Sequence, residues 1–115
     1  MEQSQQNVKY TQSMTSIVND NITHFDFDDI EYCVSIDDKK VYLTQTEFKL
    51  FKYLFERQGQ VITKQELQRN ILQKDLGQFD RNLDMHISNT RKKLVETRLP
   101  RTLINTVRGQ GYCFS

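Results

Sequence analysis

The 115-residue chain has the length of one small domain with a tail, because domains usually run to about 100–150 residues. With 37% apolar and 27% charged residues it resembles an ordinary soluble globular protein. No apolar run approaches the roughly 20 residues of a membrane helix, and the start, MEQSQQNVKY, lacks the apolar core of a secretory signal. These features argue against a membrane-spanning chain, and we expect no membrane contact.

The net charge of +1 hides an uneven distribution along the chain. Residues 1–38 carry one lysine against eight acidic residues, whereas residues 39–115 carry fifteen lysines and arginines against seven acidic residues. From residue 81 onwards there are seven basic and two acidic residues. Such a concentration of positive charge favours a polyanionic partner.

Few side chains suggest catalysis or metal binding. Cys33 and Cys113 are far apart and form no CxxC motif, which favours two small buried thiols in a reducing compartment over a disulfide. His24 and His86 are isolated, and no metal-ligand spacing or nucleophile–base arrangement is present in the sequence. We therefore expect no metal, no cofactor and no enzymatic activity.

The first part of the chain divides into a polar tail and a region of short strands. Residues 1–22 are rich in Gln, Ser, Asn and Thr without a sustained apolar period, which predicts a flexible linker or tail before a domain over residues 23–115. The segments at 24–27, 32–36 and 41–43 (HFDF, YCVSI and VYL) predict a small antiparallel sheet. Asp37-Asp38-Lys39 predicts the hairpin turn before the last of them.

Two segments then predict helices. Thr44-Gln45-Thr46-Glu47 has capping-box spacing, and one helical face follows, formed by Phe48, Phe51, Leu54 and Phe55. Gly59 is expected to end this helix as a left-handed C-cap. VIT at 61–63 predicts a short strand, and residues 63–66 repeat the capping box before a second helix with Leu67 and Ile71 inward.

A loop through Gly77 leads to a third predicted helix, which begins near Asp80 in a region that Pro100 closes. LINTV and YCF then flank Arg108-Gly109-Gln110-Gly111, whose glycines suit a tight turn with positive φ. The order of sheet, helix, strand, helix, helix and hairpin predicts an α+β fold of the winged helix-turn-helix type.

The third helix has two distinct faces at about 100° per residue. Its predicted buried stripe contains Leu83, Ile87, Thr90 and Leu94. The opposite arc contains Arg81, Met85, Ser88, Asn89, Lys92 and Glu96, with Arg91 and Lys93 on the flanks. Phe48, Phe51, Phe55 and Phe79 are expected in the core.

The outward face suits the major groove of DNA. Asn can pair with adenine, Arg with guanine, and an apolar group can touch a thymine methyl. Arg91 and Lys93 would reach phosphates, and Arg108 on the hairpin would enter a narrow minor groove. Asp84 would accept from a cytosine amine or hold Arg81 three residues away. The alternative is a helix whose outer face is merely solvated.

Four segments in this order and spacing resemble a known family. LTQTEFKLFKYL, VITKQEL, FDRNLDMHISNTRKKL and INTVRGQGYCF resemble the C-terminal DNA-binding effector domain of OmpR/PhoB-type response regulators, over residues 24–115. The DMHISN segment is most similar to the branch typified by the Cpx envelope-stress regulator.

The resemblance implies a four-stranded N-terminal antiparallel sheet, three helices and a C-terminal β-hairpin wing. It also implies a cytoplasmic two-component system that regulates transcription, in which a phosphorelay phosphorylates an N-terminal receiver domain and drives dimerisation. The effector domain would be a monomer alone and a dimer on double-stranded DNA, bound head to tail on direct-repeat half-sites. An isolated effector fragment is favoured over a natural stand-alone regulator.

The resemblance also assigns roles to individual positions. The DNA-binding positions that it implies are Arg81, Asn82, Met85, Ser88 and Asn89 at the groove or its edge, Arg91 towards phosphate, and Arg108 and Tyr112 on the wing. The helical period adds Lys92 and Lys93 to the DNA-binding residues. The loop of Gln73, Lys74, Asp75, Leu76, Gly77 and Gln78 aligns with a segment that contacts RNA polymerase in some members.

Three positions depart from the family pattern. Many members have arginine where this chain has Ser88 and Asn89, so fewer guanine contacts are expected there. Thr90 replaces an expected leucine and leaves a hydroxyl that needs a partner.

Since fold does not fix function, the alternative to DNA binding is a winged-helix protein-interaction module that does not bind DNA.

Overall fold

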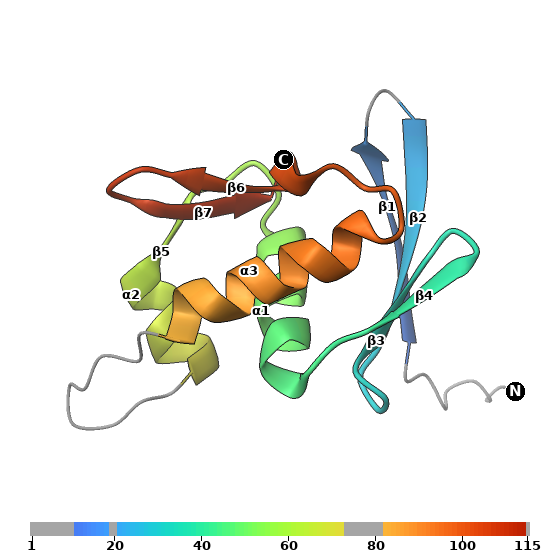
Figure 1. The fold of residues 1–115 in the computed structure, drawn as a ribbon, viewed down its shortest axis with the longest axis horizontal. Coiled ribbons are helices and arrows are strands. Elements are labelled where there is room, and N and C mark those ends of the chain that lie inside the picture. The colour runs from blue at the N-terminus through green and yellow to red at the C-terminus, as the bar shows by residue number, and fades with distance from the viewer. Residues whose placement is uncertain (1–10, 19–20, 73–81, 115) are drawn as a thin grey trace, which may run out of the picture. The chain divides into compact units, whose positions relative to one another are not determined.

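The computed structural model describes residues 11–18, 21–72 and 82–114, and Figure 1 shows the elements they form. The chain divides into an N-terminal unit, Met1–Tyr42, and a C-terminal unit, Leu43–Ser115. Within the described ranges, no helix has the length and apolar character that crossing a membrane requires.

The N-terminal unit is a four-stranded antiparallel sheet in which the strands follow one another in chain order. The strands are β1 (Thr11–Val18), β2 (Asn21–Asp28), β3 (Cys33–Ile36) and β4 (Lys39–Tyr42). The predicted antiparallel sheet is confirmed, and its buried side chains include Phe25, Phe27, Val34 and Ile36. Their alternation along β2 and β3 is the period-2 pattern of a sheet with one buried face.

Strand β1 corrects the expectation for the start of the chain. A loose tail was predicted over residues 1–22, but β1 pairs with β2 from Thr11↔Asp28 to Val18↔Asn21. The prediction is wrong for residues 11–18 and also for Asn21 and Ile22, because they lie in paired strands. The inward positions of β1 include Ser16 and Val18, which are both buried. An inward serine hides the apolar alternation by which a strand is recognised. Residues 1–10 lie outside the described residues.

The predicted turn between β3 and β4 is confirmed. Asp37 takes a left-handed conformation with φ 54°, which aspartate tolerates better than most side chains. Its backbone N–H donates to the His24 carbonyl at 2.9 Å, and its carboxylate accepts from the His24 N–H at 3.1 Å. The turn is therefore tied to the neighbouring strand β2.

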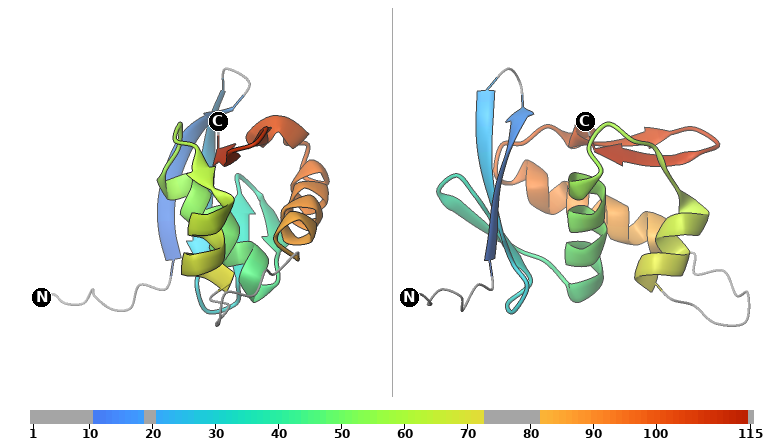
Figure 2. Two further views of the ribbon diagram at one scale, coloured as in Figure 1. Left: turned by 90° about the vertical axis from the view of Figure 1, so that its left-hand side faces the viewer. Right: turned by 180° about the vertical axis from the view of Figure 1, so that it is seen from behind.

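The C-terminal unit has the predicted order of helices and hairpin (Figure 2). Its elements are α1 (Gln45–Glu56), β5 (Ile62–Thr63), α2 (Lys64–Leu67), the π-helical turn η2 (Gln68–Leu72), α3 (Asn82–Val95), the 3-10 turn η3 (Arg101–Leu103), β6 (Ile104–Val107) and β7 (Gly111–Phe114). Strand β7 lies between β5 and β6 in a three-stranded sheet. We call the β6–β7 hairpin the wing.

Helix α1 starts and packs as predicted. The Thr44 hydroxyl accepts from the Glu47 N–H at 3.1 Å, and the Glu47 carboxylate accepts from the Thr44 N–H at 3.0 Å, which completes the capping box. Phe51 and Phe55 form an aromatic cluster with Phe114 of β7, at ring-centroid distances of 5.8 and 4.9 Å from it. Phe48 is also buried, and Phe79 lies outside the described residues.

Gly59 does not cap α1, contrary to the prediction. The helix ends at Glu56, and the cap residue Arg57 donates its N–H to the Leu54 carbonyl. Gly59 does have a positive φ of 83°, but it acts two residues later, where its N–H donates to the Phe114 carbonyl at 2.9 Å. The glycine therefore turns the chain towards β7 after the helix has ended.

The second predicted helix is short and irregular. The Thr63 hydroxyl accepts from the Glu66 N–H at 3.0 Å as expected, but the Glu66 carboxylate accepts a hydrogen bond from the Tyr53 hydroxyl of α1. After Leu67, which is buried, the chain continues as the π-helical turn η2, and Ile71 is only half-buried.

Candidate nucleic-acid interface

Helix α3 buries the predicted stripe. Leu83, Ile87, Thr90 and Leu94 are all buried, so the helical period identified the inner face correctly. The described helix begins at Asn82. The expected start near Asp80 and the candidate residue Arg81 lie outside the described residues.

The opposite face of α3 is open to solvent. Met85 is 49% exposed, which confirms that this thioether points outward. Asn82, Ser88 and Lys92 are exposed as well, and Asn89 is partly exposed. The face thus offers two amides, a hydroxyl, an ammonium and an apolar group to a partner.

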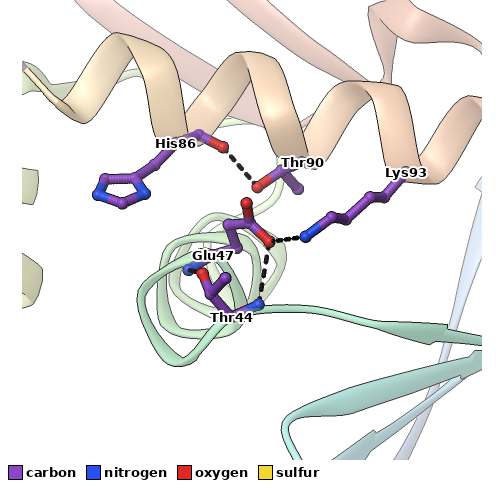
Figure 3. A network of polar contacts seen from close by, with 5 residues as sticks. All are labelled: Thr44, Glu47, His86, Thr90 and Lys93. Atoms are coloured by element: carbon purple, nitrogen blue, oxygen red, sulfur yellow. Dashed lines mark hydrogen bonds and ion pairs between the residues drawn. The ribbon is translucent and has the colours of Figure 1, made fainter.

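The Thr90 hydroxyl has a hydrogen-bond partner, which the sequence alone could not identify. Thr90 is fully buried, and its hydroxyl donates to the His86 carbonyl one turn earlier at 2.7 Å (Figure 3). A threonine can therefore occupy this inner position without leaving an unsatisfied polar group.

Lys93 makes a contact inside the unit. Its ammonium lies 2.6 Å from Oε1 of Glu47, which is buried and also accepts the Thr44 N–H (Figure 3). A buried carboxylate needs a compensating cation. Lys93 therefore joins α3 to the first turn of α1, whereas the sequence predicted a flank residue facing phosphate.

Arg91 holds the wing. Its Nε and Nη2 donate to the Ile104 carbonyl at 2.9 and 2.6 Å, and Nη2 also donates to the Thr106 hydroxyl at 2.7 Å. Arg91, which the sequence predicted to contact phosphate, thus binds β6 in the structure. It also lines an open hollow of about 350 Å³ together with Thr102, Ile104, Asn105 and Thr106.

The carboxylate of Asp84 is bound within the C-terminal unit, whereas Arg81, one of its predicted partners, lies outside the described residues. Its carboxylate accepts a hydrogen bond from the Tyr112 hydroxyl of β7 and lies 3.3 Å from the Lys64 ammonium of α2. The hydrogen bond from Tyr112, assisted by Lys64, lowers the pKa of Asp84. Burial, followed by the bond to Asp84, raises the pKa of Tyr112. Both groups therefore keep this pairing at neutral pH.

The two glycines at the wing turn are required for different structural reasons. Gly109 has φ 74°, as the turn was expected to need. Gly111 has no positive φ; a Cβ there would lie 1.9 Å from the Ile62 carbonyl oxygen, so the close approach of β5 requires the glycine. Arg108 is exposed at the turn, and Tyr112 is buried.

Sequence patterns missed the contacts that join separate elements. Lys64 was not singled out, and nothing near Asp84 in the sequence points to Tyr112, 28 residues away.

The candidate polymerase loop, residues 73–78, lies outside the described residues. In the N-terminal unit, Asp28, Glu31 and Cys33 place possible metal-ligand atoms within 4.8 Å of one another, a grouping that the spacing did not suggest. Cys33 and Cys113 are both free thiols.

A capped first helix, a third helix with one exposed face and a C-terminal hairpin define a winged helix-turn-helix domain. The protein family described as "Transcriptional regulatory protein, C terminal" matches residues 38–114, and the chain belongs to this family. This family of transcription regulators is the one that the sequence motifs resembled, and it agrees with the expectation of a non-enzymatic domain.

The similar proteins include members of the predicted branch. The chain is 42% identical to the transcriptional regulatory protein CpxR of Escherichia coli over 78 residues, which are 68% of the chain and 34% of that protein. It is 40% identical to the CpxR homolog of Haemophilus influenzae over 76 residues, 66% of the chain and 34% of the relative. The matched part of the chain thus spans about a third of the length of these relatives.

Solved structures show the same fold. The DNA-binding domain of CpxR from E. coli matches with a TM-score of 0.65 and 34% identity, covering 89% of this chain and 96% of that one. The DNA-binding domain of Klebsiella pneumoniae RstA, in complex with the RstA box, matches with a TM-score of 0.68 and 27% identity over 93% and 98% of the two chains.

Proposed function

We propose that the chain binds double-stranded DNA in a sequence-specific manner and regulates transcription as the effector domain of a two-component response regulator. The observation that carries this proposal is the exposed face of α3, with Met85, Ser88 and Asn89, together with a wing whose turn carries the exposed Arg108. The solved complex of the similar RstA domain with its DNA box supports it.

The exposed face of α3 would read bases. Asn89 and Asn82 carry amides that can pair with adenine, the Ser88 hydroxyl can bond to several bases, and the Met85 thioether can contact a thymine methyl. We retain Arg81 in this group on the resemblance alone.

Two exposed cations would bind the sugar-phosphate backbone. Lys92 lies on the outer face of α3 and Arg108 on the wing turn, and each could neutralise a phosphate or, for Arg108, enter the minor groove. Arg91, Lys93 and Tyr112 were also expected at DNA. Their polar groups bind other parts of the unit, so we assign them to the support of the reading surface.

The remaining partners belong to the whole regulator. We propose a receiver domain on the N-terminal side, since similar regulators are about three times as long as the matched region. Direct-repeat DNA half-sites, a monomer that dimerises on DNA, an RNA polymerase contact through residues 73–78 and a cytoplasmic location follow from the family resemblance.

Binding to two duplexes tests the proposal. A labelled duplex recovered by selection from random sequences should bind at least about 1,000-fold more tightly than a scrambled duplex of the same composition, as specific DNA-binding proteins do. Equal binding to both duplexes contradicts sequence-specific recognition. No binding to either at low salt, together with co-purification of a partner protein, would support the protein-interaction alternative instead.

A further inference from the structure

We propose that Asp84, Tyr112 and Arg91 form a brace that sets the position of the wing against α3, and that they act on DNA recognition through this position rather than by touching DNA. The inference rests on the proposed DNA-binding function and deepens it. It assigns a positioning role to three residues that lie beside the exposed face of α3.

The first arm of the brace joins α3 to β7. Tyr112 is only 4% exposed, and its hydroxyl donates to the Asp84 carboxylate near the start of α3. A hydroxyl has a single hydrogen to donate, so this bond leaves none for a phosphate oxygen. Lys64, 3.3 Å from the same carboxylate, adds α2 to the junction.

The second arm joins α3 to β6, the edge strand of the three-stranded sheet. Arg91 makes three hydrogen bonds to this strand, two of them to the Ile104 carbonyl and one to the Thr106 hydroxyl. Asp84 and Arg91 lie two turns apart on α3, so the two arms hold both strands of the wing at separate points along the helix.

The ring of Tyr112 links the two arms. The Arg91 guanidinium carbon lies 5.7 Å from the ring centroid and the Lys64 ammonium lies 5.8 Å from it, within the range of cation–π attraction. A wing held in this way is ordered before DNA arrives, so less conformational freedom is lost when the wing and α3 engage the duplex together.

Tyr112→Phe tests the first arm, because it removes the hydroxyl and keeps the ring. We expect a three- to tenfold loss of affinity for the selected duplex, about the effect of one hydrogen bond. The salt dependence should not change, since no cation is removed, and binding to a scrambled duplex should fall by less, because sequence-independent contacts do not require one fixed arrangement of α3 and the wing. A direct phosphate contact would instead weaken both duplexes alike, because phosphate contacts carry no sequence information.

Tyr53→Phe is the matched control. The Tyr53 hydroxyl also donates to a carboxylate, that of Glu66, and accepts from the Asn70 amide at 2.8 Å, but these bonds join α1 to α2 and η2 rather than α3 to the wing. The control should lower the midpoint of thermal unfolding by a similar amount and leave the ratio of selected to scrambled affinity unchanged. A loss of this ratio in both variants would mean that general destabilisation is responsible, and would overturn the brace.

Amide hydrogen exchange without DNA separates this proposal from the proposed function. Exchange of the β6 and β7 amides should rise at least severalfold in Tyr112→Phe and stay as in the native chain in Tyr53→Phe. Unchanged exchange in Tyr112→Phe overturns the brace even if the chain binds DNA. Failure of the unmutated chain to discriminate between the duplexes overturns the DNA-binding proposal, and with it the inference about recognition.

Discussion

At the scale of single residues, two polar side chains are buried on the inner side of α3, and both have partners. Glu47 is the one acidic side chain that is fully buried within the described ranges, and Lys93 neutralises it. Thr90 sits on the same side and bonds to its own helix. The Glu47–Lys93 contact joins α3 to α1, the Thr90 hydrogen bond satisfies a buried hydroxyl within α3, and the opposite face of α3 is left for a partner.

Replacing Lys93 by methionine should destabilise the domain. The buried Glu47 carboxylate would lose its cation, and we expect the free energy of unfolding to fall by about 2–3 kcal/mol, less than for a fully enclosed pair because Lys93 is partly in solvent. Urea unfolding measures this change. The double variant with Glu47→Gln should lose less than the sum of the two single variants, and strict additivity would show that the pair is not coupled.

Thr90→Val should be almost neutral. It keeps the shape of the side chain, and the His86 carbonyl still accepts the helical N–H of residue 90, so we expect less than about 1 kcal/mol change in the free energy of unfolding. Thr90→Ala, which leaves a void at a fully buried site, should cost more. Thermal unfolding of the two variants decides, and the reverse order would show that the hydroxyl itself is needed.

At the scale of elements, the position of the wing depends on the close approach of the β5 and β7 backbones. Strand β5 contributes only Ile62 and Thr63, and it pairs with Tyr112 and Gly111 of β7. The Gly111 Cα faces the Ile62 carbonyl so closely that no side chain fits between the strands. The short β5 therefore ties the wing to the segment that precedes α2.

Gly111→Ala should disrupt this pairing. Its Cβ would meet backbone atoms of Ile62 that cannot rotate away, so we expect a loss of about 3 kcal/mol or more in the free energy of unfolding. Gly109→Ala is the matched control: it has open space but a positive φ, and should cost about 1 kcal/mol. Equal costs in a denaturant titration would contradict the steric reason for Gly111.

The elements also show what local sequence can predict. The capping box and the apolar stripe of α1 are local patterns, and the structure has both. The strand β1 and the irregular α2–η2 segment escaped prediction because a buried serine and a change of helical geometry leave no apolar period. The Asp84–Tyr112 and Glu47–Lys93 contacts escaped because they are formed between residues 28 and 46 positions apart.

At the scale of the whole molecule, charge follows the division into units. The N-terminal unit carries three lysines and arginines against eight acidic residues, and the C-terminal unit carries thirteen against seven. This difference was visible in the sequence, but composition could not show which cations are used inside the fold. Lys93 and Arg91 bind Glu47 and β6, so the structure favours Lys92 and Arg108 for contact with phosphates.

Arg108→Ala should change the salt dependence of DNA binding. If the wing arginine neutralises one phosphate, the slope of log affinity against log salt should become shallower by about 0.9. Lys49→Ala, which removes an exposed cation from α1, is the control and should keep the native slope. Fluorescence anisotropy over a range of salt concentrations measures both, and an unchanged slope for Arg108→Ala would remove the wing from the DNA contact.

The most direct measurement for the reading face of α3 is selection of binding sites from random duplexes, run in parallel on the native chain and on Asn89→Ala. The native chain should enrich one half-site, and the variant should recover that half-site with one or two positions relaxed, at a cost of about 1–3 kcal/mol on the native site. Enrichment of no sequence by the native chain, or identical profiles for the two proteins, would contradict base reading by this face.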